Sequence, residues 1–121
     1  MDYSDLIGIP FEYNGRGPDK FDCYGLVRHI HEQKGIQIPD YNSPSDGATI
    51  TAMMLGELRL WGNCELKPGA VLLFRVPGNL HVGTYLGDDW FLHTWEPSGG
   101  VVRERLSDWE NRLMGIYEYV G

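Results

Sequence analysis

The second half of the chain constrains the fold most, because apolar runs alternate there with turn residues at short intervals. The runs are A-V-L-L-F-R-V from Ala70, H-V-G-T-Y-L-G from His81, W-F-L-H-T-W from Trp90 and V-V-R-E-R-L from Val101. Pro-Gly-Asn, Asp-Asp and Pro-Ser-Gly-Gly separate them, and these residue types favour tight turns. The pattern predicts four successive strands joined by short connections.

Other segments complete an α+β layout. Residues 107–113 are expected to form a short helical turn, and G-I-Y-E-Y-V at 115–120 is expected to form a fifth strand. Earlier in the chain, apolar spacing predicts a short helix over 2–7, a longer one over 23–34 and another over 48–60. Helices that come first and strands that follow are typical of the α+β class.

The helix expected from Cys23 places a thiol in its first turn. Asp22 is a good N-cap, and Leu26, Val27 and Ile30 fall on one apolar helical face. The unpaired N–H groups and the positive dipole end of a helix favour a thiolate, which is the nucleophilic form of cysteine. A reactive cysteine is therefore expected at this position.

Length and charge exclude several functions. The 121 residues are enough for one domain, which we expect to span 1–121, and the net charge of −7 argues against nucleic-acid or membrane partners. No apolar run reaches the roughly 18 residues of a membrane span, and M-D-Y-S-D-L lacks the features of a signal peptide. A soluble product made in the cytoplasm is expected, with Cys23 and Cys64 as free thiols.

Two histidines in the strand region could serve this cysteine. If the strands that carry His81 and His93 form a hairpin about Asp88, the two imidazoles come close across the ladder. A cysteine nucleophile needs a base to take and return its proton, and the base needs a group that fixes its tautomer. Cys23, His81 and His93 could fill these three roles.

Less specific interpretations compete with this one. A lone cysteine is most often core packing, and that interpretation holds for Cys64, whereas His29 and His31 are expected to be solvated on the helix surface. A metal site from the proposed catalytic residues lacks the short-spaced ligand pair of zinc sites. Five aromatic residues are expected to pack in the core and sheet rather than bind ligands: Trp90, Trp95, Trp109, Tyr117 and Tyr119.

Four stretches together resemble the NlpC-type cell-wall cysteine peptidases. They are I-P-F-E-Y-N-G-R-G-P-D-K-F-D-C-Y-G-L-V, L-K-P-G-A-V-L-L-F, H-V-G-T-Y-L-G and F-L-H-T, and they span nearly the whole chain. The resemblance implies a reduced papain-like fold, with N-terminal helices packed on a five- to six-stranded antiparallel sheet. Within the family, G-R-G-P-D-K-F-D-C and G-L-V-R look most similar to single-domain tail-tip proteins of tailed phages, prophages and gene transfer agents.

The resemblance also assigns roles to residues. It implies that Cys23 is the nucleophile, His81 the general base and acid, and His93 the polar third member. Tyr13 would bind the oxyanion together with the Cys23 backbone N–H. Two residues that flank the cysteine are expected at the substrate, with no metal or other cofactor required: Asp22 and Tyr24, the latter standing where the family usually has serine.

The expected function is a phage tail-associated cysteine endopeptidase. By resemblance, it would hydrolyse an amide bond next to a D-glutamyl or diamino-acid residue in the stem peptides of peptidoglycan. Other tail-tip proteins would be its partners, and the virion tail tip would be its place while DNA enters the cell. The alternative is a structural tail-tip assembly module that has the same fold and acts by binding other tail proteins.

Overall fold

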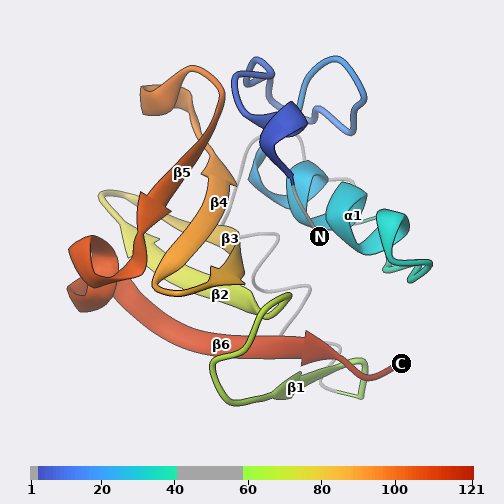
Figure 1. The fold of residues 1–121 in the computed structure, drawn as a ribbon, viewed down its shortest axis with the longest axis vertical. Helices are drawn as coiled ribbons and strands as arrows, with labels where there is room; N and C mark the ends of the chain where they lie inside the picture. Colours follow the sequence, from blue (N-terminus) through green and yellow to red (C-terminus); the bar gives the residue numbers. More distant parts are fainter. Residues whose placement is uncertain (1–2, 41–58) are drawn as a thin grey trace.

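A six-stranded antiparallel sheet forms the body of the protein, in the order β1-β6-β2-β3-β4-β5. The computed structural model describes residues 3–40 and 59–121, and Figure 1 shows their arrangement. None of the described helices is long and apolar enough to cross a membrane. The strands are β1 (Trp61–Asn63), β2 (Val71–Val76), β3 (Asn79–Gly87), β4 (Trp90–Thr94), β5 (Val101–Arg105) and β6 (Leu113–Tyr119).

The expected α+β class is confirmed, and the four apolar runs form β2 to β5. The sequence did not predict β1, because a strand of three residues is too short to show alternation; it is defined by pairing of Trp61 with Tyr119 on β6. The helix expected over 48–60 lies outside the described residues, apart from Arg59 and Leu60, which form a turn.

Helix α1 (Cys23–Gln33) begins where the sequence predicts. The Asp22 carboxylate accepts a hydrogen bond of 2.7 Å from the Gly25 N–H, which satisfies one of the free donors of the first turn. On the apolar side of the helix, Val27 is fully buried in a core with Leu73 and Val82 of the sheet. This packing holds α1 on one face of the sheet (Figure 1).

A short 3-10 helix, η3 (Leu106–Arg112), covers the opposite face. Its Trp109 packs edge-on against Phe74 and Phe91, with ring centroids 5.2 and 5.6 Å apart. Side chains alternate between the two faces of a strand, so Leu73 points toward α1 while Phe74 points toward η3. The sheet therefore has an apolar core on each side.

The segment that precedes α1 connects the start of the helix to the residues just before the edge strand β5. It contains the short helix η1 (Ser4–Leu6), and isolated bridges join Pro10 to Gly100 and Phe11 to Phe21. A third short helix, η2 (Glu96–Ser98), lies in the connection between β4 and β5. The N-terminal loop and η2 are thus held near the start of α1.

His31 differs from the sequence-based expectation. It is buried rather than solvated, its Nδ1–H donates to the Val27 carbonyl at 2.8 Å, and burial lowers the pKa of its imidazole. The side of α1 that carries His31 faces Trp61, with ring centroids 6.1 Å apart. Because β1 was not predicted, no sequence pattern indicated that this side of the helix would be covered.

We expect Gly25→Ala to destabilise the fold, although alanine is favoured over glycine inside a helix by about 1 kcal/mol. A Cβ at Gly25 would lie 1.9 Å from the Gly15 carbonyl oxygen, so the N-terminal loop would have to move. Overpacking of this kind costs about 1–3 kcal/mol. Urea unfolding would measure the loss.

Gly62→Ala is the matched control, because a Cβ there meets Val120 at an ordinary 3.6 Å. We expect it to leave the free energy of unfolding nearly unchanged. A Gly25→Ala variant as stable as the wild type would show that the close approach of the Gly15 carbonyl to α1 does not constrain this position.

Candidate active site

One pocket, about 280 Å³ in volume, lies at the start of α1 and at one end of the sheet. The end of β2, the start of β3 and the end of β4 meet there, because neighbouring antiparallel strands reverse direction. Cys23, His81 and Trp95 line the pocket, and Phe11 and Tyr13 of the N-terminal loop line it as well. His93 is not among the lining residues, so His81 is the histidine that meets the pocket.

Cys23 is the first residue of α1, and its surroundings favour the neutral thiol. Burial, with a smaller contribution from the neighbouring Asp22 carboxylate, raises the pKa of the Cys23 thiol to about 12. Backbone hydrogen bonds from Val82 and Tyr24 oppose this shift without reversing it. Burial therefore opposes the thiolate that the helix start is expected to favour.

The structure brings His81 and His93 together on one face of adjacent strands. His81 Nε2 and His93 Nδ1 are 2.7 Å apart, and both side chains are buried. Burial lowers the pKa of His81 well below its usual value, and the nearby His93 adds to this shift. Opposite His93 stands Gly83, where a Cβ would approach the His93 Cβ to 3.2 Å. The glycine leaves room for the ring.

Aromatic rings enclose the two imidazoles. The His81 ring lies 5.4 Å from the ring of Trp95, and the His93 ring lies 4.9 Å from that of Trp109 and 4.7 Å from that of Phe91. Trp109 packs in the core as expected, but Trp95 also lines the pocket. The surroundings keep water from the histidine pair and favour its neutral form.

Glu104 of β5 extends the pair, and the sequence did not predict it. Its Oε2 lies 2.5 Å from His93 Nε2. Glu104 is opposite Phe91 in the ladder, which places its side chain on the same face as His93. The run V-V-R-E-R-L predicted the strand, but only the register between β4 and β5 identifies this carboxylate.

Tyr13 lies at the pocket as the resemblance implied, but it already has a partner. Its hydroxyl donates to the Glu96 carboxylate of η2, and this hydrogen bond raises the pKa of Tyr13. The side chain is half-exposed, and Glu96 also lines the pocket. Glu96 is a second residue that the sequence did not indicate, because η2 is far from Tyr13 along the chain.

The expectation that Tyr24 contacts substrate is wrong. Its side chain is fully buried in the core on the α1 side, and its hydroxyl donates to the Pro39 carbonyl at 2.6 Å. The residue after Cys23 points into the core between α1 and the sheet, which accounts for an aromatic ring at this position. Asp22, in contrast, does line the pocket.

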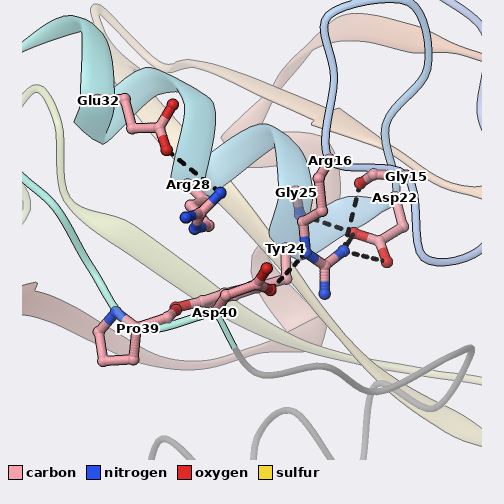
Figure 2. A network of polar contacts seen from close by, with 9 residues as sticks. All are labelled: Gly15, Arg16, Asp22, Tyr24, Gly25, Arg28, Glu32, Pro39 and Asp40. Atoms are coloured by element: carbon pink, nitrogen blue, oxygen red, sulfur yellow. Dashed lines mark hydrogen bonds and ion pairs between the residues drawn. The ribbon is translucent and has the colours of Figure 1, made fainter.

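An ion-pair network holds Asp22 (Figure 2). Arg16 NH1 lies 2.8 and 2.7 Å from the two Asp22 carboxylate oxygens, and Arg16 Nε lies 2.7 Å from Asp40 Oδ1. Asp22 is buried, so this pairing supplies the charge that its carboxylate needs away from water. Arg16 thereby joins the N-terminal loop to the helix start and to the segment after α1.

The zinc alternative has no support in the geometry. Among residues 3–40 and 59–121, no three His, Cys, Asp or Glu side chains are placed to hold a metal ion together. Cys23 and Cys64 are both free thiols, and Cys64 packs at the edge of the core on the η3 side. Cys64 is therefore separate from the pocket residues described above.

Residues 8–118 match the NlpC/P60 family. The chain belongs to this family. A probable endopeptidase of Mycobacterium tuberculosis is 32% identical over 89 residues, which cover 73% of this chain and 20% of that protein. The murein DD-endopeptidase and LD-carboxypeptidase MepS of Escherichia coli is 28% identical over 116 residues, covering 91% of this chain and 55% of MepS.

A solved structure supports the same fold. The NlpC/p60 domain of the peptidoglycan hydrolase SagA superposes with a TM-score of 0.66 at 22% identity, covering 94% of this chain and 90% of that domain. The reduced papain-like architecture implied by the sequence resemblance is therefore confirmed. This NlpC/P60 chain spans from about a fifth to about half of the two curated relatives named above.

We expect Arg16→Met to slow alkylation of Cys23, measured with iodoacetamide near neutral pH in a Cys64→Ala background. The guanidinium lowers the pKa of Cys23, so its loss leaves the Asp22 charge unopposed and reduces the thiolate fraction. A rise of one in the pKa reduces that fraction about tenfold, so we expect a rate lower by about threefold to tenfold.

Lys20→Met is the control, because Lys20 belongs to the same loop and its ion pair with Glu12, at 3.4 Å, is exposed. It should leave the alkylation rate unchanged. Equal rates in the two folded variants would show that Arg16 does not influence the thiol.

Proposed function

We propose that this NlpC/P60 chain is a cysteine peptidase that hydrolyses amide bonds in the stem peptides of peptidoglycan, with Cys23, His81 and His93 as its catalytic residues. One observation carries the proposal: the 2.7 Å contact between His81 and His93 lies beside a pocket that Cys23 also lines. A helix-start cysteine and a buried imidazole pair at one pocket are the kinds of group that acyl transfer requires.

The reaction starts from a neutral thiol and a neutral imidazole. Burial raises the pKa of Cys23 and lowers that of His81, so a resting ion pair is disfavoured. The Cys23 proton therefore passes to His81 as the sulfur attacks the substrate carbonyl. The resulting imidazolium is held by its hydrogen bond to His93.

Collapse of the tetrahedral intermediate completes acylation. His81 gives its proton to the departing amine, and the acyl group stays on Cys23 as a thioester. Water activated by His81 then hydrolyses the thioester and regenerates the thiol. The Cys23 backbone N–H is the proposed oxyanion donor, and Tyr13 joins it once its hydroxyl leaves Glu96.

The choice of substrate rests on family relationship. The mycobacterial relative is named a probable endopeptidase, and MepS is named a murein DD-endopeptidase and LD-carboxypeptidase. Cleavage beside a D-glutamyl or diamino-acid residue is proposed from the resemblance of the four sequence stretches to NlpC-type peptidases. This chain would need no cofactor for the reaction.

We expect Cys23→Ala to abolish hydrolysis of defined muropeptides by the purified protein, because the nucleophile is lost, and His81→Gln to do the same, because an amide cannot take and return a proton. Product analysis by chromatography would measure both. Cys64→Ala is the matched control and should keep the wild-type rate.

The same measurement tests the alternative function. A folded wild-type chain that hydrolyses no muropeptide would favour the structural tail-tip module. Hydrolysis that survives in a folded Cys23→Ala variant would remove the assigned nucleophile.

The proposed setting is the tail tip of a phage-like particle, where the enzyme would open the cell wall while DNA enters and would contact other tail-tip proteins. The stretch G-R-G-P-D-K-F-D-C supports this setting by its likeness to tail-tip members of the family. Antibodies against this chain should label one end of the particle tail in electron micrographs. Particles of the producing strain that lack the chain altogether would contradict the assignment.

A further inference from the structure

His81, His93 and Glu104 form a line of hydrogen-bonded side chains. The proposed mechanism uses the two histidines but not Glu104. Its Oε2 lies 2.5 Å from His93 Nε2, while His93 Nδ1 lies 2.7 Å from His81 Nε2. The His93 side chain is fully buried, and the Glu104 side chain is 37% exposed. The line therefore runs from the surface of β5 through β4 to the histidine that meets the pocket.

The chemistry of a carboxylate determines where the protons of this line lie. An ionised carboxylate can only accept hydrogen bonds, so His93 must carry its proton on Nε2. A neutral His93 then presents a bare Nδ1, which can only accept, and His81 must donate from Nε2. A neutral His81 is left with an unprotonated Nδ1, the nitrogen that can take the Cys23 proton.

We propose that Glu104 is a positioning residue that fixes the tautomers of His93 and His81, so that the His81 ring keeps a free Nδ1 as the catalytic base. The inference rests on the proposed peptidase function. Without the carboxylate, His93 can also carry its proton on Nδ1 and donate to His81 Nε2. His81 would then be protonated on Nδ1 and unable to act as a base.

The surroundings of His93 give Glu104 this control. The titratable groups that face its ring nitrogens are His81 from β3 and Glu104 from β5, and aromatic rings cover its faces. Burial lowers the pKa of both imidazoles, and the Glu104 carboxylate partly offsets this shift at His93. Two neutral rings in contact require one donor and one acceptor. The carboxylate makes His81 Nε2 the donor and His93 Nδ1 the acceptor.

The tautomers can be measured without any substrate. In the ¹⁵N-labelled full chain near neutral pH, we expect ring nitrogen shifts that show His93 protonated on Nε2 and His81 protonated on Nε2. In Glu104→Leu, both rings should shift toward the Nδ1–H form. Glu104→Gln keeps a carbonyl acceptor and should retain more of the wild-type pattern, which also serves if Glu104→Leu does not fold.

Kinetics on one muropeptide provide the second readout. We expect Glu104→Leu to lower kcat by about 10-fold to 100-fold with little change in KM. Loss of a hydrogen-bond partner that orients a metal-bound histidine has an effect of similar size. Glu104→Gln should fall between this variant and the wild type. Glu110→Leu, which removes an exposed carboxylate from η3, is the matched control and should keep the wild-type kcat.

A double-mutant cycle shows whether Glu104 acts through His93. In a His93→Ala background, Glu104→Leu should cause no further loss of kcat. An additional loss there, or wild-type tautomers and kcat in folded Glu104→Leu, would overturn the inference. If the wild type hydrolyses no muropeptide, the proposed function fails, and the nitrogen shifts still decide whether Glu104 fixes the tautomers.

Discussion

The Asp22 carboxylate is the interaction on which the geometry of the site depends. It caps the first turn of α1 through the Gly25 N–H and receives the Arg16 guanidinium, which also binds Asp40. A single buried anion therefore fixes the helix start, the N-terminal loop and the segment that follows the helix. Because Cys23 is the next residue, the same anion also raises the pKa of the thiol. Asp22 thus stabilises the helix start but disfavours the Cys23 thiolate, and the Arg16 guanidinium lowers the pKa of the thiol again.

A neutral resting site follows from this arrangement. Burial raises the pKa of the Cys23 thiol and lowers the pKa of His81 and His93, so their charged forms are disfavoured until substrate arrives. Charge then develops only during attack, when the proton moves from sulfur to imidazole. In such a site the tautomer of the base matters more than its resting charge, and that gives Glu104 its significance. The aromatic rings around the pair keep water away from the contact between His81 and His93.

Local pattern was enough to predict much of the fold. Period-two alternation and turn residues identified β2 to β5, and an N-cap followed by an apolar stripe located the start of α1. The sequence also predicted that His81 and His93 would meet, because a short turn can pair their two strands. Two expectations were wrong, a solvated His31 and a Tyr24 at the substrate, and burial opposes the expected Cys23 thiolate. Each depends on what packs over a residue, and no local pattern carries that information.

The sequence by itself determined β2 to β6, the start of α1, the helix-start cysteine and the two histidines, because capping, periodicity and turn chemistry act over a few neighbouring residues. Tertiary structure decided which distant groups complete the site. Glu104 reaches His93 only through the register of β5 on β4, and Glu96 reaches Tyr13 only because η2 and the N-terminal loop both lie near the start of α1. Burial, which raises the pKa of Cys23, is likewise a property of the assembled layers.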